Sequence, residues 1–407
     1  MEHLKLVIVG HVDHGKSTLI GRLLYDTGSL PEGKMQEIER TCKALGRDIE
    51  FAYVMDHLQE EREQSITIDT AQTFFKTGRR EYVIIDAPGH KEFVKNMITG
   101  ASQAEAAILI VDAEEGVQEQ TKRHAYILGM LGLKQVIAVL NKMDKVGYGK
   151  ERFEEVKASL LEFLEAINIK PTYVIPISAK EGDNVARKSE KMPWFDGMSI
   201  LESLDTFVNT ERHTEKPLRY PIQDIYMVGG DRVFAGRVES GRIREGQEVT
   251  VLPDPRKTKV TGIKVFMDDG KKEAEAGESI GVTIKDKLFL DRGSIICDGR
   301  LPEVTDTVSA KVFWMGKQPL KKTDRVTIKL ATEEVDCGIE SIDRRLDSST
   351  LEVLEEDAPQ LNENEVGEMV IKTVRPIVVE NFNEVPELGR FVIVQGYDVA
   401  AGGIIVE

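Results

Sequence analysis

Eight consecutive residues near the N-terminus have the types and spacing needed to bind a phosphate chain. Gly10, Gly15, Lys16 and Ser17 fit the pattern of glycine, any four residues, glycine, lysine and serine. The whole stretch is Gly10-His11-Val12-Asp13-His14-Gly15-Lys16-Ser17, followed by Thr18. In such a loop, backbone N–H groups surround the β-phosphate, the lysine bridges the β- and γ-phosphates, and the serine hydroxyl holds Mg²⁺. The stretch predicts a nucleoside triphosphate site, with a chance glycine turn as the alternative.

Two further segments could supply catalytic and metal-binding groups. The segment Asp86-Ala87-Pro88-Gly89-His90 follows an apolar run. In it, Asp86 can reach Mg²⁺ through water, the Gly89 N–H can contact the γ-phosphate, and His90 can orient the attacking water. Thr67, in the polar stretch 60–69, is the candidate switch residue, because its carbonyl and hydroxyl could reach Mg²⁺ and the γ-phosphate. The alternatives are a solvated charged helix entering an edge strand for the switch stretch, and a structural histidine for His90.

These segments define the candidate reaction centre. The candidate catalytic residues are Lys16, Thr67 and His90, and the candidate Mg²⁺ ligands are Ser17, Thr67 and Asp86.

The segment Asn141-Lys142-Met143-Asp144 has the residue types of a guanine-recognition loop. An aspartate can accept hydrogen bonds from both N1–H and the 2-amino group of guanine, and adenine lacks this pair of donors. A site built on such bonds rejects the analogue by a factor of about 10⁴ or more. Asn141 and Lys142 would tie this loop to the phosphate loop, and the backbone of Ser178-Ala179-Lys180 could contact the guanine 6-oxygen. The nucleotide predicted from the sequence is therefore GTP or GDP.

An alternation of apolar strands and helices would place all these segments at one edge of a sheet. Apolar runs at residues 4–9, 81–85, 106–111, 136–140 and 172–177 predict strands, and residues 18–25 and 120–131 predict helices. In a parallel sheet, ligands bind at the carboxyl ends of the strands. We therefore expect an α/β phosphate-loop GTPase domain, with a mostly parallel, doubly wound sheet, over residues 1–212.

The second half of the chain has a different pattern. After a polar linker at 209–217, short alternating strands broken by glycine turns predict two all-β barrel domains, at residues 217–300 and 301–407. Trp314 is expected in the core of the second barrel, with an exposed docking surface as the alternative.

Composition limits the setting of the protein. The 407 residues are 41% hydrophobic and 30% charged, and three cysteines (Cys42, Cys297 and Cys337) are too few for a disulfide framework or a zinc cluster. Without a signal-type segment or an apolar run of about 18 residues, we expect a cytoplasmic protein that is neither exported nor membrane-spanning. The net charge is −16, and residues 303–407 carry 11 Lys and Arg against 21 Asp and Glu, a net charge of −10. This balance disfavours a nucleic-acid partner.

The phosphate loop with Thr18, together with the segment 96–102, resembles the GTPase domain of the translational GTPase superfamily, and the resemblance covers residues 1 to about 210. It implies that Asp13 contacts a monovalent cation and that Val12 and Ile66 form an apolar gate near His90. Ser65 stands where this family usually has glycine, which changes the backbone angles open to the switch loop.

Several segments resemble the GTPase subunit of bacterial sulfate adenylyltransferase. They are residues 120–132, 188–195, 230–241 and 312–320. The resemblance implies that the chain couples GTP hydrolysis to formation of adenylyl sulfate from ATP and sulfate, in complex with a separate, ATP pyrophosphatase-like catalytic subunit. The alternative is an elongation factor that delivers aminoacyl-tRNA, and His14 in the phosphate loop favours it. Because more segments resemble the sulfate adenylyltransferase subunit than favour an elongation factor, we expect the sulfate-activating function.

Overall fold

The computed structural model describes residues 3–30, 33, 51, 72–85, 104–130, 132–208, 213–265 and 270–406. The chain forms two compact units, Met1–Asn209 and Thr210–Glu407. Among the residues singled out above, Thr67 and Asp86-Ala87-Pro88-Gly89-His90 lie outside the described residues, as do Cys42, Ser65, Ile66 and the segment 96–102.

The first unit is built on a six-stranded sheet in the order β2-β3-β1-β4-β5-β6. The strands are β1 (His3–Gly10), β2 (Gln72–Lys76), β3 (Glu81–Ile85), β4 (Ala106–Asp112), β5 (Gln135–Asn141) and β6 (Tyr173–Pro176). All neighbours pair in parallel except β2, which pairs antiparallel with β3. Every residue of β4 is buried, as expected for a strand whose two faces are both covered by helices.

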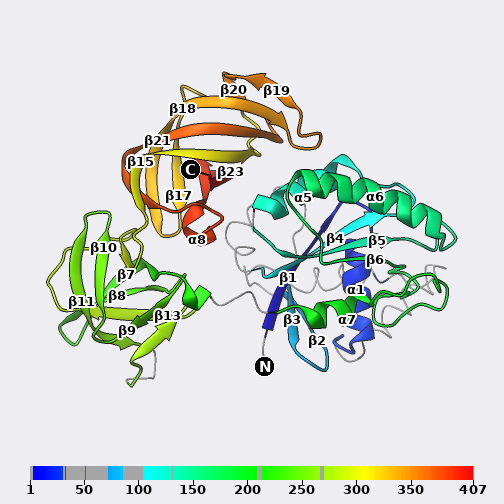
Figure 1. Cartoon of the computed structure of the whole chain (residues 1–407), viewed down its shortest axis with the longest axis horizontal. Helices are drawn as coiled ribbons and strands as arrows, with labels where there is room; N and C mark the ends of the chain where they lie inside the picture. Colours follow the sequence, from blue (N-terminus) through cyan, green and yellow to red (C-terminus); the bar gives the residue numbers. More distant parts are fainter. Residues whose placement is uncertain are drawn as a thin grey trace. The chain divides into compact units, whose positions relative to one another are not determined.

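Helices cover both faces of this sheet (Figure 1). They are α1 (Lys16–Asp26), α5 (Glu119–Met130), α6 (Lys150–Ala166) and α7 (Ile200–Thr206). Helix α1 packs Leu19 and Leu23 into one core with Leu4 and Leu6 of β1. The order strand, loop, helix around β1 and α1 is therefore the one that the sequence predicts, and it places the phosphate loop at the carboxyl edge of the sheet.

The first half of the second unit is a closed barrel in the strand order β10-β11-β13-β8-β7-β14. Its strands are β7 (Arg219–Val228), β8 (Asp231–Arg237), β10 (Glu248–Leu252), β11 (Arg256–Lys264), β13 (Ser279–Ile284) and β14 (Ile295–Cys297). A small sheet of β9 (Arg242–Arg244) and β12 (Glu273–Glu275) and the short helix η2 (His213–Glu215) accompany it. Tyr220 and Phe234 are buried in its core.

The rest of the unit is a larger sheet in the order β17-β22-β23-β15-β21-β18-β19, which closes on itself because β17 also pairs with β18. Its strands are β15 (Glu303–Trp314), β17 (Arg325–Leu330), β18 (Glu333–Asp347), β19 (Val353–Glu356), β21 (Glu365–Val379), β22 (Arg390–Gln395) and β23 (Asp398–Ile405). The pair β16 (Leu320–Lys321) with β20 (Gln360–Leu361) and the short helix α8 (Pro386–Gly389) complete it. The predicted fold class, an α/β domain followed by two β-barrels, is confirmed.

Trp314 ends β15 and is fully buried, and its indole N–H donates to the carbonyl of Gln318 at 2.9 Å. The prediction of a barrel-core tryptophan is confirmed, and the alternative of an exposed docking residue is wrong. Cys297 and Cys337 are free and buried. In the part of the chain that the structure describes, no helix is both long enough and apolar enough to cross a membrane.

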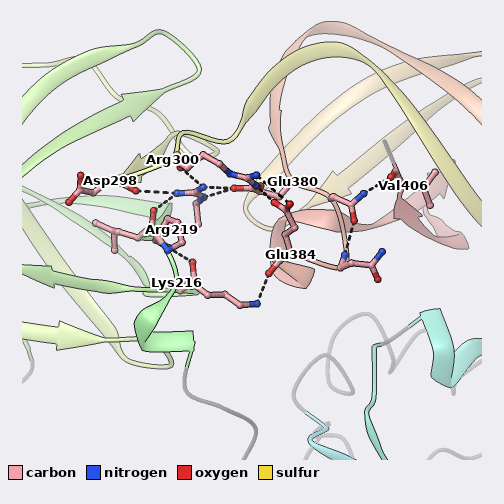
Figure 2. A network of polar contacts seen from close by, with 12 residues as sticks. Lys216, Arg219, Asp298, Arg300, Glu380, Glu384 and Val406 are labelled. Atoms are coloured by element: carbon pink, nitrogen blue, oxygen red, sulfur yellow. Dashed lines mark hydrogen bonds and ion pairs between the residues drawn. The ribbon is translucent and has the colours of Figure 1, made fainter. Parts of the chain in front are cut away.

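Charged side chains join the two barrels (Figure 2). Arg219, on β7, and Glu380, directly after β21, form a buried ion pair, in which Nε donates to Oε1 at 2.7 Å. Arg300 donates to the other carboxylate oxygen of Glu380 at 3.1 Å and also pairs with Glu384. The apolar cluster Leu252, Ile295, Cys297, Val378, Val385 and Leu388 contains residues of both barrels.

Candidate functional site

The phosphate loop leaves β1 at Gly10 and enters α1 at Lys16. Both of its terminal glycines are required by close contacts. A Cβ at Gly10 would lie 2.3 Å from the carbonyl oxygen of Ile110, and a Cβ at Gly15, where φ is +96°, would lie 2.4 Å from Nδ2 of Asn141. The neighbouring strands β4 and β5 thus leave no room for a side chain at either position.

Lys16 turns its side chain back over the loop. Its Nζ donates to the carbonyl oxygens of Gly10 at 2.8 Å and His11 at 2.7 Å, which holds the ammonium group at the loop. The N–H of Leu19 donates to the carbonyl of Gly15 at 2.9 Å. The first N–H groups of a helix have no partner within the helix, and together with the helix dipole they favour an anion there. The loop and the start of α1 therefore form a cradle that fits a phosphate chain.

The remaining loop residues differ in exposure. Val12 and Ser17 are exposed, and Asp13 is exposed with a left-handed φ of +62°. His14 is fully buried. Its Nδ1 accepts the backbone N–H of Asp112 at 3.2 Å, and its Nε2 lies 3.3 Å from a carboxylate oxygen of Glu115. Burial, together with the nearby His11, lowers the pKa of His14, so the ring is neutral at pH 7 and carries its hydrogen on Nε2.

Asn141 connects three segments of the site. Its Nδ2 donates to the carbonyl of His14 at 2.9 Å, and its Oδ1 accepts the N–H of Ala179 at 2.9 Å. The predicted tie between the base loop and the phosphate loop is thus present in the geometry. The Ala179 N–H is directed at Asn141, whereas the contact of residues Ser178-Ala179-Lys180 with a guanine oxygen stays a prediction.

Asp144 presents a carboxylate with a fixed orientation. The hydroxyl of Ser178 donates to its Oδ1 at 2.5 Å. The preceding residue, Met143, is buried, and its N–H donates to the carbonyl of Ile177 at 3.1 Å. A carboxylate that is held from one side still has free lone pairs. With these it can accept two hydrogen bonds from donors on the edge of a planar base.

The structure adds two residues that sequence reasoning missed, Asp112 and Glu115. Asp112 contacts Lys142, with Oδ2 and Nζ 2.6 Å apart, and its N–H donates to His14. The available signal was an acidic residue directly at the end of the apolar run 106–111. That signal did not identify the partners, since His14 lies 98 residues away in the sequence.

Comparisons with known families agree with this geometry. Family models match three parts of the chain: the elongation factor Tu GTP binding domain over residues 1–210, elongation factor Tu domain 2 over 231–297, and the GTP-eEF1A C-terminal domain-like model over 307–406.

The chain is also similar to whole proteins. It is 41% identical over 418 residues to elongation factor 1-alpha of Pyrococcus furiosus, covering 99% of this chain and 97% of that protein. It is 42% identical over 420 residues to elongation factor 1-alpha of Methanopyrus kandleri, covering 98% and 97%. A crystal structure of sup35 complexed with GMPPNP is 25% identical, covers 100% of this chain and 94% of that chain, and gives a TM-score of 0.47.

These relatives overturn the sulfate-activating function. Similarity to proteins named elongation factor 1-alpha covers 98% or more of the chain, and neither a sulfate adenylyltransferase role nor an ATP pyrophosphatase-like partner subunit is supported. Both predictions were wrong. The physical reason is that the matching segments serve packing: residues 120–132 include the buried face of α5, and residues 312–320 include the buried end of β15. Such residues report a shared fold and carry no information about a partner.

The base loop, the phosphate loop and the three matching family models lead to one conclusion. The chain belongs to the family of GTPases that share the elongation factor Tu-type GTP-binding domain, among whose members is elongation factor 1-alpha.

Proposed function

We propose that this chain is a translation elongation factor that binds aminoacyl-tRNA in its GTP-bound state and delivers it. The observation that carries this proposal is the 41% identity to elongation factor 1-alpha over 99% of the chain, which includes both barrels as well as the GTPase domain. We assign the three domains to residues 1–212, 217–300 and 301–407. A signalling GTPase with neither partner would leave the two barrels without a role.

In this proposal the nucleotide lies along the carboxyl edge of the sheet. Residues 10–18 surround the phosphates, with Lys16 on the β- and γ-phosphates, and Asn141, Lys142, Met143 and Asp144 hold the base together with Ser178, Ala179 and Lys180. The support in the structure is the cradle around Gly15 and the carboxylate of Asp144, held by Ser178.

Mg²⁺ would be held by Ser17 and Thr67 directly and by Asp86 through water, and it would neutralise charge between the β- and γ-phosphates. The exposed hydroxyl of Ser17 at the start of α1 fits this role. Asp13, an exposed residue of the phosphate loop, would contact a monovalent cation.

Hydrolysis requires little covalent chemistry from the protein. Water attacks the γ-phosphorus, the bond to the bridging β–γ oxygen breaks, and GDP and inorganic phosphate form. His90 orients the water, Lys16 stabilises charge on the phosphate oxygens, and Thr67 senses whether the γ-phosphate is present. Loss of this phosphate releases the switch segment and lowers the affinity for aminoacyl-tRNA.

A protection assay tests the proposal. Spontaneous hydrolysis of the ester of aminoacyl-tRNA is followed with the protein and GTP, a non-hydrolysable GTP analogue, or GDP. We expect both triphosphates to slow the hydrolysis, with an affinity for aminoacyl-tRNA about 100-fold above that of the GDP form, within the usual range of such couplings. Deacylated tRNA as competitor is the control. Equal hydrolysis rates with GTP, GDP and no protein would contradict the proposal.

A further inference from the structure

Asp112 is the last residue of β4 and belongs to none of the sequence motifs, yet it contacts two of them. It is fully buried and lies in register with Asn141 at the end of the neighbouring strand β5. Its N–H donates to Nδ1 of His14 in the phosphate loop at 3.2 Å, and its Oδ2 lies 2.6 Å from Nζ of Lys142 in the base loop. Asp112 therefore bridges the loops that would hold opposite ends of a nucleotide.

The carboxylate of Asp112 is charged at neutral pH. Burial favours its neutral form, but the hydrogen bonds from Lys142 and from the backbone N–H of Glu114, the latter at 2.7 Å, outweigh burial and keep the pKa below its usual value. A buried carboxylate with one cationic partner makes that partner's position well defined, because separating the pair would leave an unpaired buried charge.

Lys142 needs such a restraint. Its φ is +61°, in the left-handed region, which costs a non-glycine residue about 1–2 kcal/mol. Asn141, the residue before it, is held at the same time by its own bonds to His14 and Ala179. Asp112 and Asn141 thus form two parallel connections between the phosphate loop and the base loop, of which the second was predicted from the sequence.

We propose that Asp112 is a positioning residue of the guanine nucleotide site, which acts through Lys142 to hold the base loop at a fixed distance from the phosphate loop. This inference rests on the proposed nucleotide site. Because Asp112 is buried behind both loops, its loss should loosen the bound nucleotide without changing the chemistry at the γ-phosphate. Changes in affinity within one site are mostly changes in dissociation rate.

The test uses Asp112→Asn in the full chain, a substitution that keeps the size of the side chain and removes the ion pair. Release of a fluorescent GDP analogue is measured by stopped flow. We expect release to be about 10- to 100-fold faster, with association and single-turnover hydrolysis of saturating GTP both within about threefold of the original protein. Asp205→Asn is the matched control, since Asp205 accepts hydrogen bonds from Tyr82 and Thr77 in the same domain.

A double-mutant cycle separates positioning from general destabilisation. If Asp112 acts through Lys142, adding Asp112→Asn to a Lys142→Met variant should change the release rate by no more than about twofold. The double variant Asp112→Asn/Lys142→Met contains neither charge of the ion pair. It can therefore be compared with Lys142→Met even if Asp112→Asn alone folds poorly. An unchanged release rate in folded Asp112→Asn, a fully additive cycle, or an equal effect of Asp205→Asn would each overturn the inference. Failure of the original protein to bind the GDP analogue would instead refute the proposed function.

Discussion

At the scale of single residues, Asp144 is the sharpest test of base recognition. Its carboxylate is held by the Ser178 hydroxyl, and a carboxylate can only accept hydrogen bonds. Asp144→Asn replaces one acceptor by an N–H₂ donor, which matches the 2-carbonyl of xanthine and clashes with the 2-amino group of guanine. We expect affinity for GTP to fall by about 10² or more and affinity for XTP to rise, because unpaired donors in a site are costly. Titration with both nucleotides measures this.

The control for this prediction is Ser178→Ala, which leaves the acceptors of Asp144 intact and removes the hydroxyl that orients them. It should weaken GTP and XTP binding alike, without a change of preference. A variant Asp144→Asn that still prefers GTP as strongly as the original protein would remove Asp144 from this role.

The residues of the phosphate loop and of the base loop could be predicted from the sequence because each loop is a local motif. Asp112 could not be predicted, because it belongs to no local motif. The phosphate loop and the base loop are each contiguous, so types and spacing within a few residues define them. Asp112 acts through His14 and Lys142, which reach it from other segments of the chain. The burial of His14 could not be predicted from the sequence either, because it depends on the pairing of β4 with β1, which brings Asp112 next to the phosphate loop.

At the scale of elements, the apolar runs located five of the six described strands of the GTPase domain to within one or two residues, and they did not identify the antiparallel strand β2 (Gln72–Lys76). The predicted strand 106–111 became β4, Ala106–Asp112, and the strand 172–177 became β6, Tyr173–Pro176. The ends differ because ladder pairing sets them: Asp112 remains in β4 through its pairing with Asn141. In the barrels, glycine turns predicted strands but not partners. β14, for example, pairs with both β10 and β7, which are distant in sequence.

The junction of the two barrels depends on one buried ion pair. Arg219 and Glu380 are both almost fully buried. Removal of Glu380 leaves the Arg219 guanidinium as a buried charge without its anionic partner, which costs about 3–5 kcal/mol. Removal of Arg219 leaves Glu380 paired with the more exposed Arg300, so it should cost less. We expect Glu380→Gln alone to lower the free energy of unfolding of the second unit by this amount, and Arg219→Met alone to lower it by a smaller amount, of at least about 1.5 kcal/mol. The double variant Arg219→Met/Glu380→Leu should recover most of the loss. Urea unfolding, followed by circular dichroism, measures both.

The matched control is the exposed ion pair of Arg244 and Glu273 in the first barrel, whose charged groups lie 2.9 Å apart. Arg244→Met should cost no more than about 1 kcal/mol, because solvent screens an exposed pair. If Arg219→Met were as mild as Arg244→Met, the junction would be held by its apolar cluster and not by the ion pair.

Glu239 introduces a pH dependence at the same junction. Burial raises the pKa of Glu239 to about 7, against the opposing effect of Arg237 and Arg390, and Glu387 adds to the rise. The unfolded chain therefore releases this proton at lower pH than the folded chain. The stability that Glu239 contributes is full below the ordinary glutamate pKa of 4.5 and is lost as the pH rises towards 7.

The corresponding variant is Glu239→Gln, whose side chain stays neutral at every pH. We expect its melting temperature to match that of the original protein near pH 5 and to exceed it by a few degrees at pH 8, where the half-buried carboxylate is charged. Glu248→Gln, at an exposed position of β10, is the control. A constant difference between Glu239→Gln and the original protein from pH 5 to pH 8 would contradict the raised pKa.

At the scale of the whole molecule, the charge balance is unusual for a protein proposed to bind RNA. The chain carries a net charge of −16, and residues 303–407 contribute −10. From this balance alone the sequence disfavoured a nucleic-acid partner, and the relatives named elongation factor 1-alpha correct that inference. Net charge describes long-range attraction or repulsion, whereas binding depends on which side chains meet the phosphates.

The contributions of net charge and of local phosphate contacts can be separated by measuring how the affinity for aminoacyl-tRNA depends on salt concentration. A protein that makes 6–10 phosphate contacts loses about 10³–10⁵ in affinity between 50 and 200 mM salt. Here, added salt also screens the repulsion between the acidic protein and RNA, which offsets part of that loss. We therefore expect the affinity of the GTP-bound protein for aminoacyl-tRNA to fall by less than about 10²-fold over the same range, a slope of about −3 or shallower. Affinity for the GTP analogue at each salt concentration is the control, since nucleotide loss would mimic weaker RNA binding. A slope of about −6 or steeper, with the nucleotide still bound, would show instead that a concentrated basic face dominates binding despite the acidic composition.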